Sequence, residues 1–301
     1  MNPYYREYSE YLAERFPGKV QKLTVDTGAS CPNRDGTLGR GGCIYCNNES
    51  FSPMAGCREG VREQLNKSKL FFARKYPEMR YLAYFQGHTA THAGVERFIR
   101  QCNEAMEVDG VIGIIIGTRP DCMPDSLLEQ LARINSEDMP VMVEFGMESA
   151  CNATLERINR CHTHTDTVNA VMRTHDAGMD VGVHLIFGLP GECENMMLSS
   201  VDAVNDMPVS FVKFHQLQIV RGTRLASMAE AERGLVHLFG VEEYIEFCCK
   251  VVARLRPDIA IDRFTSQAPS DMLIAPRWGL KNHEFTARLQ NRLRELSNSR
   301  S

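Results

Sequence analysis

Runs of apolar residues recur along the first two thirds of the chain. They cover residues 20–25, 81–86, 111–118, 140–148, 180–190 and 211–220. Several of these runs are apolar almost without alternation, which is typical of strands that are covered on both faces of a parallel sheet. The pattern therefore predicts six strands between residues 20 and 220.

The segments between the runs keep the spacing of amphipathic helices. Apolar residues share one helical face in residues 95–106, in 127–134 after Pro124, and in 168–172 before Gly178. Strands that alternate with helices indicate an α/β fold made of repeated βα units. Periodicity alone leaves two architectures open, a partial (β/α)6 barrel of the TIM type and an open doubly wound sheet.

Composition narrows the class of protein. The chain has 301 residues, of which 43% are hydrophobic and 24% charged, and a net charge of −4. This balance is typical of a globular domain and gives no overall basic field for nucleic acid. No apolar stretch is long enough to cross a bilayer, and the first residues lack the apolar core of a secretory signal. Eleven cysteines in such a chain favour a reducing compartment, so we expect a cytoplasmic protein without membrane association.

Three cysteines, Cys31, Cys43 and Cys46, follow the first apolar run with the spacing C-x11-C-x2-C. Three thiolates on a four-iron cluster would leave one iron free to bind a small molecule. Alternatively, Cys57 would complete a four-ligand zinc site. The spacing alone leaves both metals open, since cysteine patterns specify metals loosely.

Polar residues also follow the other predicted strands. Gln86 follows the second run, Arg119 and Asp121 the third, Glu144 and Glu148 belong to the fourth, and Gly188 begins a GLPGE turn in the fifth. In both candidate architectures, chemistry gathers at the carboxyl ends of parallel strands. The cysteines and these side chains are therefore expected at one end of the sheet.

The stretch CPNRDGTLGRGGCIYCNNESFSP resembles the cluster loop of the YhcC-type radical S-adenosylmethionine (SAM) proteins, bacterial relatives of the catalytic subunit of Elongator. The resemblance continues in the family's order through YLAYFQ, GTRPDCMPD, EFGMESACNATLERINRCHT, HLIFGLPGE, VKFHQLQIVRGTRLA and LIAPRWGLK, and it spans nearly the whole chain. It implies a partial (β/α)6 radical SAM barrel. We divide the chain into an N-terminal helical segment (1–19), a radical SAM core (20–220) and a short C-terminal extension covering the barrel (221–301).

The resemblance implies a [4Fe–4S] cluster on Cys31, Cys43 and Cys46, with SAM on the fourth iron. Reductive cleavage of SAM would give a 5′-deoxyadenosyl radical that abstracts hydrogen from a substrate. An electron donor of the flavodoxin or ferredoxin type is expected. The residues that similarity or strand position assigns to SAM are Tyr45, Gln86, Glu148, Arg160 and the turn Gly188, Leu189 and Pro190. Glu148 departs from the glutamine that related enzymes often carry, but a carboxylate can still accept bonds from ribose hydroxyls.

The substrate is less defined. Lys213, His215 and Gln216 end the sixth run and are expected to face the cavity as the catalytic, substrate-side group. The relation to Elongator suggests tRNA and wobble-uridine chemistry, with RNA docked near the basic segments 58–80 and 281–301. The alternative function is a zinc-stabilised RNA-binding or scaffold protein without turnover.

Overall fold

The structure, a computed structural model, describes residues 2–50, 52, 54–232 and 234–299. In this part of the chain, seven parallel strands form one sheet in the order β1-β2-β3-β4-β5-β6-β8, and two strands form a small antiparallel pair, β7-β9. The strands are β1 (Val20–Val25), β2 (Arg80–Phe85), β3 (Val111–Thr118), β4 (Val141–Glu148), β5 (Asp180–Phe187), β6 (Phe211–Gln216), β7 (Ile219–Val220), β8 (Ala260–Arg263) and β9 (Leu273–Ala275).

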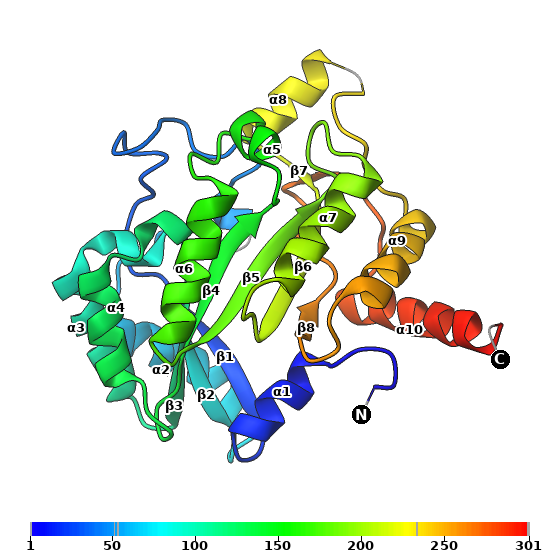
Figure 1. Cartoon of the computed structure of the whole chain (residues 1–301). Helices are drawn as coiled ribbons and strands as arrows, with labels where there is room; N and C mark the ends of the chain where they lie inside the picture. Colours follow the sequence, from blue (N-terminus) through cyan, green and yellow to red (C-terminus); the bar gives the residue numbers. More distant parts are fainter. Residues whose placement is uncertain (1, 51, 53, 233, 300–301) are drawn as a thin grey trace.

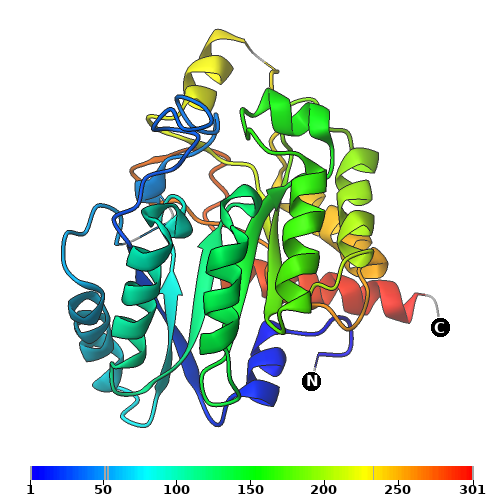
Figure 2. The same ribbon diagram turned by 60° about the vertical axis from the view of Figure 1, so that its left-hand side comes forward.

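Helices surround the outer face of the sheet (Figures 1 and 2). The α-helices are α1 (Tyr8–Arg15), α2 (Val61–Ala73), α3 (Val95–Met106), α4 (Asp125–Ile134), α5 (Asn152–Arg157), α6 (His164–Asp176), α7 (Glu194–Asn205), α8 (Arg224–Ala231), α9 (Val241–Arg254) and α10 (Asn282–Asn298). Short 3-10 turns lie at η1 (Asn48–Ser50), η2 (Ala90–Ala93) and η3 (Pro120–Cys122). No helix in the described ranges is long and apolar enough to cross a membrane.

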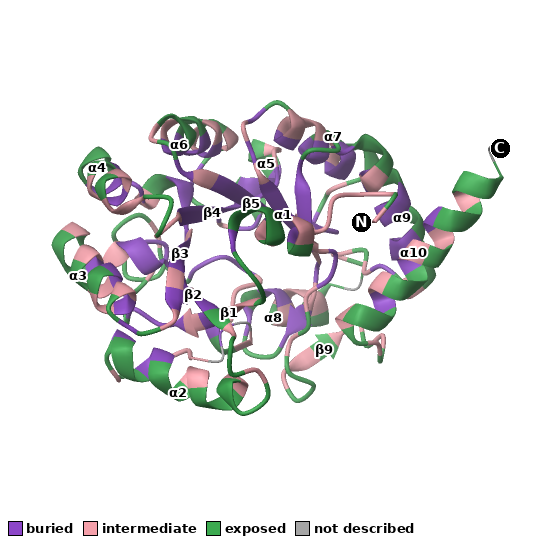
Figure 3. Cartoon of the chain, turned by 90° about the horizontal axis from the view of Figure 1, so that it is seen from below, coloured by how far each residue is buried: buried purple, intermediate pink, exposed green. Residues whose placement is uncertain are grey.

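The strand order decides between the two architectures that periodicity left open. Strands β1 to β6 lie side by side in chain order, whereas a doubly wound sheet reverses its order at a switch point. A constant right-handed crossover then places every connecting helix on the same face, and the sheet curls into the half-barrel seen from below in Figure 3. The predicted barrel is thus confirmed.

Two sequence predictions of strand length were too long, and two strands, β8 and β9, were missed. The fifth run ends as a strand at Phe187, because Gly188 turns the backbone with a φ of +91°. The sixth run divides into β6 and β7. Strand β8, from the segment assigned to a covering extension, instead pairs with β6 and lengthens the sheet.

Apolar side chains cover the outer face of the sheet and close the amino end of the barrel. Outward side chains such as Phe85, Val143 and Phe214 pack with the helices in the main apolar core. At the amino end of the barrel, Tyr8 and Tyr11 of α1 pack with Phe211 and Leu82, and this second cluster closes that end. The opposite end, where the strands finish, is left for loops and the candidate site.

Candidate functional site

One cavity of about 210 Å³ lies at the carboxyl ends of the strands. Its wall includes Cys31, Cys43 and Cys46, all as free thiols. Cys57 is not part of this wall. In the described ranges, no three Cys, His, Asp or Glu side chains are close enough to enclose a single metal ion. The three predicted thiols therefore border one shared space, as the sequence analysis expected from their position after β1.

Close backbone contacts shape the loop that carries the thiols. The backbone N–H groups of Arg34 and Cys46 donate to the carbonyl oxygens of Cys31 (2.7 Å) and Cys43 (3.1 Å). A Cβ atom at Gly39 would lie 2.4 Å from Asn33 Oδ1 and 2.9 Å from Cys161 Sγ. Because real Cβ atoms do not approach so closely, only glycine lets this loop pack against the segment after α5.

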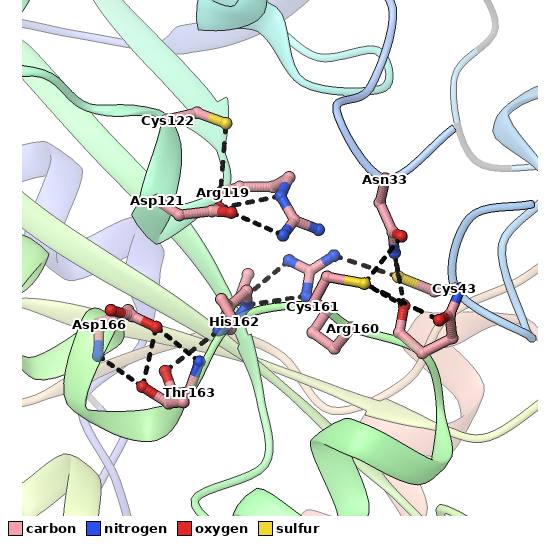
Figure 4. A network of polar contacts seen from close by, with 12 residues as sticks. Asn33, Cys43, Arg119, Asp121, Cys122, Arg160, Cys161, His162, Thr163 and Asp166 are labelled. Atoms are coloured by element: carbon pink, nitrogen blue, oxygen red, sulfur yellow. Dashed lines mark hydrogen bonds and ion pairs between the residues drawn. The ribbon is translucent and has the colours of Figure 1, made fainter. Parts of the chain in front are cut away.

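Arg160 connects that segment to the thiol loop (Figure 4). Its Nη1 donates to Cys43 Sγ over 3.5 Å, its Nη2 donates to the carbonyl oxygen of Gly146 over 2.8 Å, and its Nε contacts His162 Nε2 at 2.9 Å. The carboxylate of Glu148 lies 3.2 Å from Nη2. Burial together with the charge of Arg160 lowers the pKa of His162 to about 3, so this imidazole is neutral and can accept the bond.

Unusual backbone conformations gather around Arg160 and the cavity. The non-glycine residues with positive φ in the described ranges are His88, Glu148, Asn159 and Cys161. His88 and Glu148 border the cavity, and the other two flank Arg160. The register of β4 against β5 shifts between Gly146 and Glu148, so a bulge turns Glu148 toward Arg160. Such conformations cluster at functional sites.

Arg119 is a cavity residue to which the sequence analysis gave no role. Its Nε and Nη2 donate to the two carboxylate oxygens of Asp121 at 2.9 and 2.8 Å. Within the described ranges, its Nη1 is buried without a hydrogen-bond partner, as are the hydroxyls of Tyr45 and Thr89. All three side chains border the cavity. The position of Arg119 directly after a buried strand was the sequence signal that could have identified it as a site residue.

Buried polar atoms without partners are rare in native proteins and call for an explanation. At this cavity they provide donors for a polar ligand next to three thiols. A cluster with one iron open to a ligand, and SAM with its amino, carboxylate and hydroxyl groups, match this set of side chains. The residues present therefore fit both groups.

An ionic network forms the floor of the cavity, which Tyr84, Glu144 and His184 border. Glu144 is fully buried and accepts hydrogen bonds from Tyr84 (2.7 Å) and Lys213, and it pairs with His184 at 3.1 Å. Lys22 lies 3.4 Å from Glu144 and 2.7 Å from Asp262. Burial alone would raise the pKa of Glu144, but the two lysines outweigh it and hold the pKa well below its usual range. The network is thus ionised, with two cations facing two anions.

The predicted substrate-side group is divided by the structure. His215 and Gln216 border the cavity. Lys213 lies in the layer below and does not border it, since its ammonium is held by Glu144 and by Tyr84 Oη at 3.1 Å. The expectation that Lys213 faces the cavity is therefore wrong, because strand side chains on one face are two residues apart and Lys213 sits one step deeper than His215.

The residues predicted for SAM also take different places. Tyr45, Gln86, Glu148 and Arg160 border the cavity, whereas the turn 188–190 does not. Leu189 is buried in an apolar cluster with Ile44 and the partly buried Tyr45. The turn therefore supports the loop of the thiols from behind.

Two family models match the chain. The Radical SAM superfamily model matches residues 31–204, and the Radical_SAM C-terminal domain model matches residues 209–295. Protein YhcC of Escherichia coli (strain K12) is 36% identical over 268 residues, which cover 89% of this chain and 85% of YhcC. The chain belongs to the YhcC-type radical SAM family. Members of the superfamily are enzymes that bind a [4Fe–4S] cluster and SAM, and these are the cofactors of this radical SAM enzyme.

Two further comparisons concern proteins linked to tRNA or to Elongator. The tRNA uridine(34) acetyltransferase of Methanocaldococcus jannaschii is 26% identical over 166 residues, which cover 54% of this radical SAM enzyme and 30% of the acetyltransferase. The solved structure of the archaeal Methanocaldococcus infernus Elp3 with an N-terminal deletion superposes with a TM-score of 0.63 at 17% identity, covering 94% of this chain and 63% of that one. This likeness concerns the fold.

Proposed function

We propose that Cys31, Cys43 and Cys46 hold the [4Fe–4S] cluster and that SAM binds beside it, in contact with Arg160 and Glu148. The observation that carries this proposal is that the three thiols border the same cavity as the buried donors without partners. When bound, the reduced cluster and SAM supply a 5′-deoxyadenosyl radical that can abstract a hydrogen atom from a substrate.

The side chains of this chain divide the remaining tasks. Arg160, whose guanidinium contacts both Cys43 and Glu148, links the two cofactors. Arg119 offers a free N–H to an acceptor on SAM. Tyr45 and Gln86 also line the cavity wall. Below them, the paired charges of Lys213 and Glu144 form a polar floor without excess charge.

We further propose that the substrate is a tRNA. Similarity to tRNA uridine(34) acetyltransferases and the shared fold with Elp3 support this class of substrate. Phosphates need cations near the cavity mouth. Four arginines beyond the carboxyl ends of the strands are exposed: Arg34, Arg40 and Arg221 on loops, and Arg224 at the start of α8. Arg34 borders the cavity itself. These four residues, the rim arginines, are the proposed docking surface.

The basic segments that the sequence suggested for RNA lie elsewhere. Arg74 and Lys75 follow α2 and precede the start of β2, which places them at the amino end of the barrel, opposite the cavity mouth. Arg288 and Arg292 pair with Glu242 and Glu246 and hold α10 against α9. We therefore do not include Arg74, Lys75, Arg288 or Arg292 in the proposed docking surface.

The rim arginines and the pair Arg74 and Lys75 lie at opposite ends of the barrel, so variants of the two groups can be compared in one binding experiment. Bulk tRNA is titrated with the anaerobically reconstituted enzyme at low and moderate salt. We expect Arg221→Glu with Arg224→Glu to weaken binding and to flatten its salt dependence, since fewer counterions are released. The matched control, Arg74→Glu with Lys75→Glu, carries the same charge change at the opposite end and should bind like the wild type.

The same preparations test turnover. Reduced enzyme should form 5′-deoxyadenosine slowly without substrate, and both double variants should retain this reaction because the changed residues lie outside the cavity wall. Mass spectrometry of tRNA nucleosides from a deletion strain would identify the product. An unchanged nucleoside profile together with salt-independent binding would overturn the RNA substrate and leave the cofactor chemistry intact.

The electron donor of the flavodoxin or ferredoxin type stays a prediction, tested by replacing dithionite with each donor in this assay. The zinc-stabilised scaffold without turnover, which the cysteine spacing left open, is not supported, since the chain belongs to a family of enzymes. Iron and acid-labile sulfide analysis should give about four of each per chain.

A further inference from the structure

Arg263 occupies the side of the cavity formed by the last strands. It ends β8, which pairs with β6 as the last strand in the order of the sheet. Its Nη2 lies 3.1 Å from His215 Nε2 on β6, and both side chains border the cavity. Arg263 is neither one of the thiols nor one of the residues proposed to contact SAM.

In the described part of the chain, no carboxylate pairs with Arg263. Of the other arginines that border the cavity, Arg119 and Arg160 each have a carboxylate partner, Asp121 and Glu148, whereas Arg34 is exposed. Among the described residues, none of the ion pairs includes Arg263, and its Nε is buried without a hydrogen-bond partner. The nearby carboxylates, Glu144 and Asp262, are already matched by Lys22 and Lys213. One positive charge is therefore left over at this end of the cavity.

His215 adds a donor rather than an acceptor. Burial, followed by the charge of Arg263, holds the pKa of His215 well below its usual range, so the ring is neutral. Because Nε2 accepts from Arg263, the proton of the neutral ring resides on Nδ1 and makes that atom a donor. A guanidinium beside an imidazole N–H presents donors to one acceptor-rich partner.

The wall beside Arg263 is held by two glutamines. Gln216 donates from Nε2 to the carbonyl oxygen of Ser266 and accepts from its backbone N–H, both at 2.9 Å. Gln218 donates to the same carbonyl at 3.0 Å and accepts from Ala268 N–H at 3.1 Å. Ser266 and Ala268 both border the cavity. These bonds occupy the Gln216 amide and fix the loop after β8 next to Arg263.

We propose that Arg263 and His215 form a subsite for an anionic group of the substrate, a phosphate or a carboxylate, in the cavity wall formed by β6 and β8. A guanidinium matches the oxygens of either group through charge-assisted hydrogen bonds. The proposal rests on the proposed function only in taking this cavity as the place where substrate enters. It requires an acidic substrate and does not require RNA.

The test uses the enzyme reconstituted anaerobically and saturated with SAM, so that the cofactor contacts are occupied. Inorganic phosphate and acetate are titrated separately by calorimetry, with potassium chloride matching the ionic strength. We expect at least one of the two to bind, and Arg263→Gln to weaken that binding about tenfold or more, as the loss of a bond to a charged group predicts. The matched control Arg277→Gln alters an exposed arginine that bonds only backbone carbonyls, and should bind normally.

The two anions distinguish the source of the charge. Preference for phosphate indicates a phosphate-bearing substrate, and preference for acetate a carboxylate-bearing one; both support the subsite. Binding of neither anion, or equal affinity of wild type and Arg263→Gln, would overturn it. Phosphate binding without tRNA binding would support the subsite while overturning the RNA substrate.

A second measurement avoids any folding defect of the variant. Phenylglyoxal labels accessible arginines of the wild-type enzyme, and peptide mass spectrometry reads the labelled positions. Phosphate or acetate should protect Arg263 several-fold and leave Arg277 unprotected. Equal labelling of Arg263 with and without both anions would contradict the subsite.

Discussion

Arg160 donates from Nη1 to the sulfur of Cys43 across 3.5 Å, so a side chain that follows α5 contacts a thiol of the loop after β1. The two residues are 117 positions apart in the chain. The same guanidinium lies 3.2 Å from Glu148 at the end of β4. This one cation therefore joins the proposed cluster site to the proposed SAM site.

The first prediction concerns the thiols. Replacing Cys31, Cys43 or Cys46 with alanine should abolish the brown iron–sulfur absorption after anaerobic reconstitution, because each removes one thiolate ligand. Cys57→Ala should retain the absorption, since Cys57 is not part of the cavity wall. The measurement is visible absorption with iron and sulfide analysis. Loss of the cluster in the Cys57 variant alone would contradict the assignment.

The second prediction concerns Arg160. Arg160→Ala should weaken SAM binding by about 1.5–3 kcal/mol, the range for hydrogen bonds to charged groups. Equilibrium binding of SAM to reconstituted enzyme, normalised to iron content, measures this. The control Arg254→Ala removes an exposed arginine paired with Asp202 and should not change SAM affinity. Unchanged SAM affinity in Arg160→Ala would remove Arg160 from the SAM site.

The third prediction uses the space beside Gly146. A Cβ atom there would lie 2.5 Å from Arg160 Nη2 and 2.7 Å from Glu148 Oε1, so Gly146→Ala should displace this ion pair. We expect weaker SAM binding with cluster content retained, because the change lies on β4 and not on the thiol loop. Gly240→Ala is the control, since a Cβ at Gly240 meets nothing within 4 Å. Wild-type SAM affinity in Gly146→Ala would show that the pair plays no part.

The fourth prediction concerns pH and the buried carboxylate of Glu144. In the unfolded chain this carboxyl has its ordinary pKa of 4.5, and in the folded protein its pKa lies well below that value. Its contribution to the free energy of unfolding is therefore complete above about pH 4.5 and is lost as the pH falls through the folded pKa. Glu144→Gln should destabilise the metal-free protein by about 3–5 kcal/mol near neutral pH, and the difference should shrink below pH 4.5.

Urea unfolding of the metal-free protein between pH 3 and 7 measures this difference. The control Glu194→Gln breaks an exposed pair with Lys250, which should contribute less than about 1 kcal/mol. If the difference in the free energy of unfolding between wild type and Glu144→Gln stayed constant down to pH 3, the carboxylate would not be held ionised by its lysines.

Local sequence determined the repeated elements. The apolar runs gave β1 to β5 in their correct order, and the spacing in 95–106 matches α3 (Val95–Met106). These predictions succeeded because apolar periodicity reports which side chains a strand or helix must bury. The spacing of Cys31, Cys43 and Cys46, with the motifs around them, was enough to identify the family before any coordinates.

Strand β8 shows where local pattern fails. It has four residues, Ala260–Arg263, and two of them are charged. Such a segment has no apolar run of its own and is typical of a loop. It becomes a strand because β6 presents an open edge and because Asp262 meets the lysines of β1 and β6 inside the barrel.

The sequence by itself therefore determined the α/β class, through its apolar runs, and the family, through motifs along nearly the whole chain. It also located the three thiols directly after the first strand. Only the tertiary structure decided that Lys213 lies below the cavity and is held by Glu144. The same holds for the free donor of Arg119 and the lack of a carboxylate partner for Arg263, both among the residues that the structure describes. The physical reason is that the free energy of a buried charge depends on its partners, and these partners come from strands that meet only when the sheet curls.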